Sequence, residues 1–258
     1  MNALTDILYG LSKWRLWTAL AFNDIRMRYK KSWIGIGWVA LSTSLFLAAK
    51  IFIFSNFSAQ PLGFFAVYLA TGFMVWRFMS SVVMESTSVY FSAAGWIKSE
   101  PIPYSTYIFQ LVYRNFITLL YSSLPVIVTL IIFQTFTLKF AITFFPVILI
   151  YLLNAVWVGM ILGVVCGRFR DLAHLIQTAM QIMFFLTPVI WVASDVGKLA
   201  NFVRWNPLAH FLAIFRDPLL YSEYPVLSWQ VVGGITVVGW IAAIFVHARF
   251  RKQVVFWI

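Results

Sequence analysis

Long apolar runs alternate with short polar breaks along the whole chain, and this pattern predicts membrane-spanning helices. A helix of about 20 residues crosses the roughly 30 Å of hydrocarbon in a bilayer. The sequence predicts an all-α, polytopic membrane protein in which residues 33–258 form a single six-helix transmembrane domain. The six expected spans are residues 33–54, 62 to between 84 and 90, 107–133, 140–165, 172–192 and 229–247.

Residues 1–32 precede the first expected span and are expected to be cytoplasmic. Within them, residues 11–31 follow the helical period, with Trp14 and Trp17 on one face and basic residues such as Arg26 on another. Aromatic and basic residues on separate faces are typical of an amphipathic helix that lies in the headgroup plane. We therefore predict an interfacial helix here, and an ordinary solvated helix is the alternative.

The segment 194–228, between the fifth and sixth expected spans, is too polar to cross the membrane and too apolar for a free loop. Its apolar stretches are short, and charged residues interrupt them. We expect short re-entrant helices on the outer face, with breaks at Pro188 and Pro207. Asn206 directly precedes Pro207 and is expected to cap the second short helix, since Asn favours the cap and Pro the first turn.

This outer segment is expected to gate the mouth of a channel, where the segments of two copies would meet. A lid without a gating role is the alternative, because lids are common at such positions. Aromatic side chains in the segment would block water and ions at the closed mouth. The expected gate residues are Trp205, Asn206, Pro207, Phe211 and Phe215.

The distribution of charge predicts the orientation of the chain. The sequence is 62% hydrophobic and only 10% charged, yet its formal net charge is +11. With the N-terminus inside, twelve Lys and Arg residues lie on the cytoplasmic side and four on the outer side. The positive-inside rule therefore predicts a multi-pass protein of the inner membrane with both termini cytoplasmic. Anionic lipid explains this basicity better than nucleic acid does, so we expect membrane lipids as partners and no nucleic acid.

The sequence lacks the motifs of several enzyme classes. The Gly-x-x-x-x-Gly-Lys-Ser/Thr loop that binds ATP phosphates does not occur, and neither does a His-Glu-x-x-His zinc motif. One Cys excludes a disulfide framework, and His174, His210 and His247 belong to no local pattern that would suggest a catalytic triad. We therefore expect this chain to have no enzyme activity, no metal and no cofactor of its own.

Three of the expected spans contain a cation, at Lys50, Arg77 and Arg114. A charge at mid-membrane costs about 2.5–3.5 kcal/mol, so such residues usually face a cavity or a partner. Arg77 and Arg114 have two interpretations: a structural pair, for which Glu85 is the candidate partner of Arg77, or contact with an anionic substrate or lipid phosphate. Lys50 lies nearer the outer surface, where we expect its side chain to snorkel toward the interface.

Aromatic residues make up 19% of the chain, and a subset lies within the spans together with two amides. Amides facing lipid would be unfavourable, whereas a sugar offers hydroxyls to amides and flat C–H faces to rings. We therefore predict a glycan path, with interfacial aromatic belts as the alternative explanation. The expected path residues are Tyr68, Trp76, Gln177, Gln181, Phe184 and Phe185.

Three motifs resemble those of polysaccharide-exporting ABC permeases. Residues 24–38 contain Arg-Tyr-Lys, then a hydrophobic-Gly step and a Trp, as at the entry to the first span of that family. Arg168-Phe-Arg-Asp171 followed by Leu186-Thr-Pro-Val-Ile-Trp191 is similar to its fifth-span signature, with Thr187 in place of the usual Ser. Asn206-Pro-Leu and Phe215-Arg-Asp-Pro218 resemble its outer Asn-Pro and Phe-Arg motif.

The resemblance implies a permease subunit for a lipid-linked polysaccharide such as O-antigen, capsule or a teichoic-acid-like polymer. It implies a homodimer that binds two copies of a separate ATPase subunit, which would bind ATP and Mg. A coupling helix is implied at residues 94–104, where the expected ATPase contacts are Ile97, Lys98, Ser99, Glu100 and Pro101. Pro101 and Pro103 would make this segment rigid, and a plain turn is the alternative.

Two other functions compete with this interpretation. A permease of the same architecture could export a small lipid or a drug, although the aromatic residues and paired amides favour a glycan. A membrane-embedded transferase would need a buried acid–base constellation, and the sequence suggests none.

Overall fold

The computed structural model describes residues 3–55, 60–192 and 203–257, and within these ranges the chain forms helices, turns and loops but no strand. The expectation of an all-α protein is confirmed. The helices are α1 (Ala3–Ser12), α2 (Trp14–Tyr29), α3 (Gly37–Phe54), α4 (Leu62–Ser86), α5 (Val89–Ser92), α6 (Ala94–Ser99), α7 (Tyr104–Phe133), α8 (Leu138–Arg168), α9 (Leu172–Leu186), α11 (Pro207–Leu220) and α12 (Val226–Trp257).

Among the described residues, five helices are long and apolar enough to cross a membrane, namely α3, α4, α7, α8 and the Val226–Arg251 part of α12. The expected fifth span, residues 172–192, corresponds to α9, which has 15 residues and ends at Leu186. Such a helix is about 22 Å long, short of the roughly 30 Å of hydrocarbon. The apolar run continues past Leu186, but Pro188 cannot donate a helical hydrogen bond, and the chain turns there. A total of six spans is therefore not confirmed, because the expected fifth span is too short in the structure.

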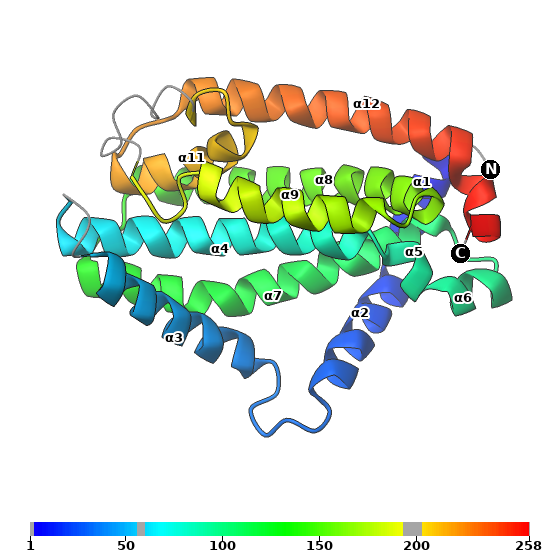
Figure 1. Cartoon of the computed structure of the whole chain (residues 1–258), viewed down its shortest axis with the longest axis horizontal. Helices are drawn as coiled ribbons and strands as arrows, with labels where there is room; N and C mark the ends of the chain where they lie inside the picture. Colours follow the sequence, from blue (N-terminus) through cyan, green and yellow to red (C-terminus); the bar gives the residue numbers. More distant parts are fainter. Residues whose placement is uncertain (1–2, 56–59, 193–202, 258) are drawn as a thin grey trace.

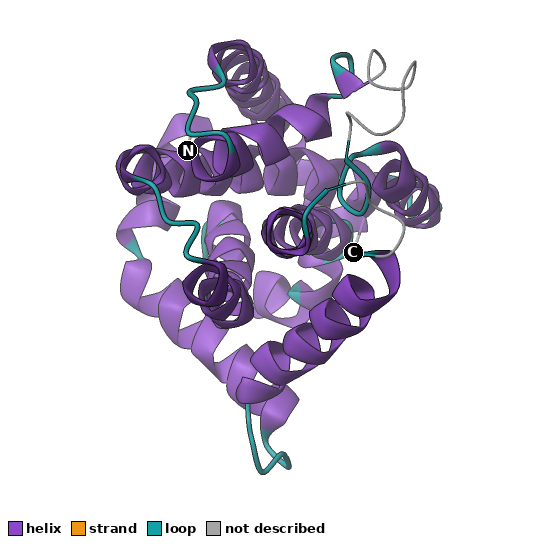
Figure 2. Cartoon of the chain, turned by 90° about the vertical axis from the view of Figure 1, so that its left-hand side faces the viewer, coloured by secondary structure: helices purple, strands orange, loops and turns teal. Residues whose placement is uncertain are grey.

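The long helices α4, α7, α8 and α12 run beside one another along the long axis of the molecule, whereas α3 diverges from them (Figure 1). Both chain termini lie with α5 and α6 at one end, which we call the termini end. The opposite end carries α11 and is called the α11 end. Seen from the α11 end, the connection between α2 and α3 projects away from the bundle (Figure 2).

The core lies between α4, α7 and α8. Of the best 18-residue window in each span, 67% is buried in α4, against 17% in α3. Glycines let α8 approach its neighbours closely: a Cβ at Gly159 would lie 2.9 Å from the Cγ2 atom of Ile108. A Cβ at Gly163 would lie 2.7 Å from Val89. Small residues at such contacts are typical of helix packing in membranes. The α4 helix is thus the buried centre of the fold, and α3 leaves most of its surface uncovered.

The N-terminal segment forms two helices where the sequence predicted one over residues 11–31. The break lies at Lys13, between α1 and α2. The ring of Trp17 packs against Phe109 and Tyr113 of α7, with centroid distances of 6.1 and 5.4 Å. Part of the aromatic face of α2 therefore covers α7, while Trp14 remains exposed. The interfacial position of this helix stays a prediction.

Candidate functional site

The helices α3, α4 and α9 together form an open face of the bundle, here called the α3–α4–α9 face. At its centre the ammonium group of Lys50 lies over three phenylalanine rings, one from each helix. Its Nζ atom is 4.5 Å from the ring centroid of Phe46, 4.6 Å from that of Phe73 and 5.0 Å from that of Phe184. Ring faces attract cations electrostatically. This aromatic cage gives Lys50 partners within the protein, while snorkelling of its side chain toward the interface stays a prediction.

Four of the expected glycan-path residues lie on α9, and a fifth joins them from α4. Trp76 is buried and its ring contacts that of Phe184 at 5.6 Å. Phe185 packs edge-on against Phe184 at 5.4 Å and is itself 66% exposed. Gln177 and Gln181 are exposed on the same helix. The structure thus brings Trp76 together with the α9 residues on one face, while their contact with a glycan stays a prediction.

Tyr68, the sixth expected path residue, lies elsewhere. It is buried near the α11 end, and its hydroxyl donates to the carbonyl oxygens of Pro188 and Trp191, both at 3.1 Å. The guanidinium of Arg216 lies over its ring, 3.6 Å from the centroid. Tyr68 therefore packs within the protomer, at the place where α4, the turn after α9 and α11 meet, which we call the α11 junction.

Arg216 is the centre of the α11 junction, and the sequence analysis did not single it out as a site residue. It is 4% exposed, and its Nη1 atom donates to the carbonyl oxygen of Pro188 at 2.8 Å. A Cβ on Gly72 would lie 1.8 Å from the Nη2 atom of Arg216, so only glycine at this position leaves room for the guanidinium. The Phe215-Arg216 motif, already noted for its resemblance, was the signal that could have revealed this residue.

Asn206 ties α11 to the end of α9. Its side-chain oxygen accepts from the backbone N–H of Leu208 at 3.0 Å, with Pro207 in the first turn, so the expected cap is confirmed. Its amide nitrogen donates to Thr187 Oγ1 at 2.9 Å and to the Leu186 carbonyl at 3.3 Å. One amide side chain therefore starts α11 and fixes it to the preceding turn.

The other expected gate residues divide into buried and exposed ones. Phe211 and Phe215 are buried. The hydroxyl of Tyr151 donates a hydrogen bond to the backbone carbonyl oxygen of Phe211 at 2.5 Å. Trp205 is 87% exposed, and Pro207 is also exposed. The part of the expected gate at 194–202 includes residues outside the described ranges, and re-entrant helices are not confirmed. Gating stays a prediction.

Asp217 follows Arg216 in α11 and has an unusual environment. The pKa of its carboxyl is raised from 3.8 to about 6, chiefly by burial; the charge of Arg216 opposes this shift and that of Glu223 adds to it. A carboxyl that is hard to ionise thus lies beside the cation of the α11 junction.

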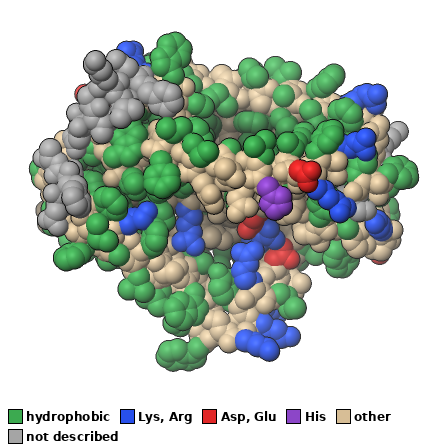
Figure 3. Space-filling model, in the orientation of Figure 1, with side chains coloured by type: hydrophobic (Ala, Val, Ile, Leu, Met, Phe, Trp, Pro, Cys, Tyr) green, Lys and Arg blue, Asp and Glu red, His purple; other side chains and the backbone are tan. Residues whose placement is uncertain are grey.

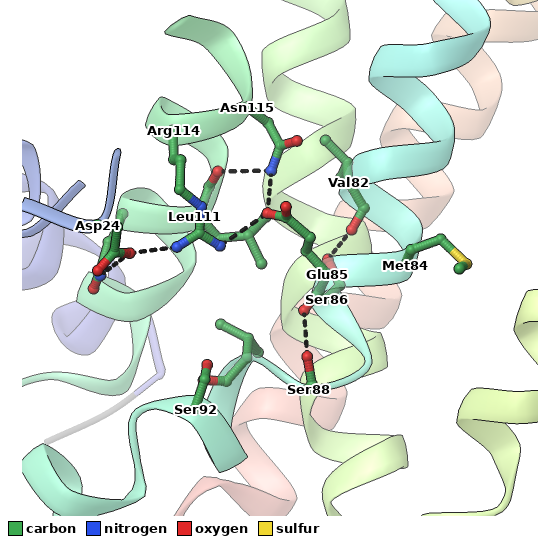
Figure 4. A network of polar contacts seen from close by, with 12 residues as sticks. Asp24, Val82, Met84, Glu85, Ser86, Ser88, Ser92, Leu111, Arg114 and Asn115 are labelled. Carbon is green, nitrogen blue, oxygen red and sulfur yellow. Dashed lines mark hydrogen bonds and ion pairs between the residues drawn. The ribbon is translucent and has the colours of Figure 1, made fainter. Parts of the chain in front are cut away.

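A second junction, at the termini end, joins α2, α4 and α7 around Arg114 (Figure 4). The guanidinium forms ion pairs with Asp24 and, at 2.8 Å, with Glu85. Asn115 donates to the same oxygen of Glu85 at 2.8 Å, and Gln110 donates to Asp24 at 2.8 Å. Two carboxylates therefore neutralise Arg114, which favours the structural interpretation of this residue. We call this group the Arg114 junction.

Arg77 does not form the Arg77–Glu85 pair that the sequence suggested. Eight residues of α-helix rotate by about 80°, so the two side chains point in different directions from α4. Glu85 contacts α7, whereas Arg77 faces α3 and donates to Thr43 Oγ1 at 2.8 Å. Arg77 thus has a hydroxyl partner and belongs to the α3–α4–α9 face.

The expected coupling segment, residues 94–104, lies at the termini end (Figure 1). It contains the helix α6 and is therefore more than a plain turn. Ile97 packs against the core from this helix. The side chains that follow are exposed, namely Lys98, Ser99, Glu100 and Pro101. Their contact with an ATPase stays a prediction.

A buried ionic cluster near α6 was missed by the sequence analysis. Asp6 of α1 bonds to His247 Nε2 at 3.0 Å and accepts from the backbone N–H of Ser105 at 3.2 Å, and Arg251 lies 3.6 Å away. Burial alone would raise the pKa of Asp6, but the hydrogen bonds and the charge of His247 outweigh it and lower that pKa. The cluster fixes both ends of the chain to α7.

The described residues contain no group of three or more His, Cys, Asp or Glu side chains that could hold a metal ion. Their polar clusters join helices, and the exposed rings, amides and cations collect on the α3–α4–α9 face. Side chains on this face can therefore contact a ligand at several positions along the bundle, through rings, amides and charged groups.

Comparison with known proteins adds the family context. No protein-family model matches the chain. Two proteins of Klebsiella pneumoniae named O-antigen export system permease protein RfbA are 27% and 24% identical to it, and one of Myxococcus xanthus with that name is 23% identical. The alignments cover 89–90% of this chain and 88–91% of the relatives. The resemblance to polysaccharide-export permeases seen in the three motifs is confirmed.

Proposed function

We propose that the chain is the transmembrane permease subunit of an ATP-driven ABC exporter that moves a lipid-linked polysaccharide, of the O-antigen or capsular kind, across the inner membrane. The observation that carries this proposal is similarity to O-antigen export permeases over about nine-tenths of both chains. The five candidate spans agree with it.

The polymer path would form between two copies of the chain. Among the spans, α3 is the least covered by its own protomer, and α9 presents two exposed amides beside it. A membrane helix with so little packing in the protomer is suited to contact with a second copy. Two α3–α4–α9 faces opposed across a dimer axis would surround the glycan with rings and amides.

ATP hydrolysis would belong to a separate subunit, bound in two copies at the termini end. The sequence has no phosphate-binding loop, so ATP and Mg would be held by that partner. The exposed residues Lys98, Ser99, Glu100 and Pro101 follow α6 directly, and Ile97 anchors this helix in the core. Movement of the partner would thus reach the spans through a packed helix, with both chain termini on the same cytoplasmic side.

The α11 segment would close the outer mouth. Its buried residues hold it to α4 and α9 through the α11 junction, while Trp205 remains exposed and free to contact a second copy. Closure by two such segments is the gating hypothesis, and cysteine cross-links between Trp205 positions of two copies would test it.

The proposed function is tested by complementation. The chain is expressed with an ABC ATPase subunit from the same organism, in a strain that lacks its own O-antigen exporter but makes the polymer, and surface polymer is measured by immunoblotting. We expect export with both subunits and none with either alone. A Glu100→Ala/Pro101→Ala variant should reduce export without reducing the amount of protein in the membrane.

Two outcomes would contradict the proposal. Restoration of drug or small-lipid efflux with no surface polymer would support the alternative function of a drug or lipid exporter. ATP hydrolysis by the purified chain alone, at rates typical of transporters, would contradict the assignment of ATP binding to a partner.

A further inference from the structure

We propose that Lys50 and Arg77 form a two-step binding track for a phosphate group on the lipid carrier of the substrate. The proposal rests on the proposed function for the identity of the substrate. The track lies on the α3–α4–α9 face, at the place where two cations have no acidic partner among the residues that the structure describes. The track would bind the charged part of the ligand, which rings and amides alone would not accommodate.

The cations within the spans differ in whether they have acidic partners. Arg114 has two carboxylate partners, Asp24 and Glu85. Within residues 3–55, 60–192 and 203–257, neither Lys50 nor Arg77 has a carboxylate oxygen within the 4.0 Å of an ion pair. The spans therefore carry two uncompensated positive charges on the same face. Uncompensated charges inside a membrane are unfavourable and usually mark the path of an ion or substrate.

Both cations keep donors for a ligand. The ammonium group of Lys50 contacts ring faces, which attract its charge, and no oxygen of the described part of the chain accepts a hydrogen bond from its three N–H donors. The guanidinium of Arg77 donates to one hydroxyl oxygen of Thr43, and it has five donors in total. Both side chains are only half-buried, so a ligand on this face can reach them.

The two cations are spaced along the membrane. Thr43, which marks the level of Arg77, and Lys50 are seven residues apart on α3, which is two helical turns or about 10 Å. The rings of Phe46 and Phe73 lie between these levels and contact each other at 5.1 Å. A diphosphate group can therefore leave one cation as it approaches the other, with an aromatic wall beside it.

An anionic group can approach these cations past the C-terminal end of α2, which lies in the projecting part of the molecule (Figure 1). The last turn of α2 carries Arg26 and Arg28, and Lys30 follows directly. Lys and Arg side chains cross the middle of the face shown in Figure 3, between the projecting α2–α3 part and the bundle. Arg28 forms an ion pair with Glu85 at 3.7 Å, so Arg26 and Lys30 supply the positive charge that leads from this helix end toward the α3–α4–α9 face.

The chemistry of the ligand follows from these groups. A neutral glycan needs hydroxyl partners and stacking surfaces, which Gln177, Gln181 and Phe185 provide, but it does not need cations. Proteins commonly bind phosphate with Arg and Lys. The planar guanidinium of Arg donates two parallel hydrogen bonds, whereas the ammonium group of Lys acts as a point charge. The phosphate could belong to the glycan carrier or to an anionic bilayer lipid. We assign the carrier, because the amides for a glycan lie on the same face.

Binding to the reconstituted protein tests the track. The permease with its ATPase is placed in nanodiscs of phosphatidylcholine, and binding of a radiolabelled polyprenyl diphosphate is measured, with the matching polyprenol as the phosphate-free probe. We expect the diphosphate to bind at least tenfold more tightly than the polyprenol. Lys50→Gln and Arg77→Gln should each weaken diphosphate binding about tenfold, and leave polyprenol binding unchanged. Equal binding of both probes, or unchanged binding by both variants, would overturn the proposal.

Control variants separate charge from folding. Lys50→Arg and Arg77→Lys keep the charge and should retain most of the binding. Lys139→Gln removes a cation that is exposed at the α11 end and bonded to the Ser222 carbonyl, and it should bind as the unaltered protein does. A glutamine variant that unfolds, as judged by its thermal midpoint, cannot be used to measure binding. The charge-retaining variant at the same position is then measured instead. If that variant also loses diphosphate binding, the charge-based track is contradicted.

Two further arms identify the source of the phosphate and protect the test from failure of the proposed function. Phosphatidylglycerol is added to the nanodiscs; displacement of the diphosphate at equal concentration would assign the site to a bilayer headgroup and overturn the carrier assignment. Export of surface polymer is measured for the same variants. Export by the unaltered chain, with no effect of Lys50→Gln/Arg77→Gln, contradicts the track alone. Diphosphate binding without any polymer export contradicts the proposed function alone.

Discussion

Two arginines join helices at opposite ends of this bundle. Arg114 at the termini end is held by Asp24 and Glu85, with amides from α7 completing the coordination of both carboxylates. Arg216 at the α11 end is held by a tyrosine ring and a backbone carbonyl, and no carboxylate of the described residues forms an ion pair with it. The same side chain thus serves an ionic junction and a neutral one.

The difference follows from the surroundings of each junction. The carboxylates of the Arg114 junction are partly exposed, with side-chain exposures of 33% for Asp24 and 27% for Glu85, so they keep part of their hydration. Arg216 is almost completely buried, and an ionised carboxylate beside it would lose its water. Burial raises the pKa of Asp217, which is the direction that such a desolvation cost predicts. Ring faces and carbonyl oxygens accept a cation without adding a second desolvated charge.

The largest expected effect is at the ionic junction. Arg114→Ala leaves Asp24 and Glu85 close together without their cation. Loss of one partner from a fully buried pair costs about 3–5 kcal/mol, and the partial exposure of this junction places the expected cost at the lower end, about 3 kcal/mol. We expect a clearly lower thermal midpoint in detergent. The double variant Arg114→Leu/Glu85→Leu should recover part of this loss. A midpoint equal to that of the unaltered chain would contradict the ionic nature of the junction.

A smaller loss is expected from crowding the neutral junction. In Gly72→Ala the new methyl group would meet the Arg216 guanidinium, and such overpacking typically costs about 1–3 kcal/mol. Gly233→Ala in α12 is the matched control, because a Cβ there meets no atom within 4 Å. Chemical-denaturant unfolding should separate the two variants. Equal stability of both would mean that Arg216 moves aside freely and does not hold α11.

The pH dependence of stability distinguishes the two ends further. Because the pKa of Asp217 in the folded state, about 6, lies above its ordinary value of 3.8, its contribution is fully present below pH 4 and is lost as pH rises through 6. Asp217→Asn should remove this decline and raise stability at pH 7 by about 1–2 kcal/mol. Midpoints at pH 4 and pH 7 measure it, with Asp171→Asn as control. If the stability of the Asp217→Asn variant falls between pH 4 and pH 7 as much as that of the unaltered chain, Asp217 is not the cause of the pH dependence.

The smallest effect concerns one hydroxyl. Tyr68→Phe keeps the ring under Arg216 but removes the hydrogen bonds to the carbonyls of Pro188 and Trp191, and about 1 kcal/mol is expected. The measurement is the unfolding midpoint, read together with polymer export. Export should persist, since Tyr68 packs within the protomer. Abolished export at unchanged stability would instead return Tyr68 to the glycan path.

The sequence predicts the features that depend on local pattern. Apolar runs located the five candidate spans, and the Asn206–Pro207 step predicted the start of α11. The end of α9 was missed because residues 187–192 remain apolar, although Pro188 was a visible signal. A run of apolar residues indicates which part of the chain prefers lipid to water. The end of the helix, in contrast, is set by the last residue that can continue the backbone hydrogen bonds.

The partners of the charged residues could not be predicted in the same way. Glu85 is eight residues from Arg77 and 29 from Arg114, yet it pairs with the more distant one because it points toward α7. Asp24 reaches Arg114 across 90 residues. The cage of Lys50 combines rings from three helices in a chain with 26 phenylalanines, where no spacing distinguishes these three from the rest. Such contacts depend on the rotation of each helix within the bundle.

The pairing of Asn206 with Pro207 also determines how this junction ages. Asparagine most readily loses its amide when the backbone nitrogen of the next residue attacks the side-chain carbonyl and closes a five-membered imide. Proline has no backbone N–H, so that ring cannot form at this position. The amide that caps α11 and bonds to Thr187 is therefore protected from spontaneous deamidation by its own neighbour, and the cap should survive for the working life of the protein.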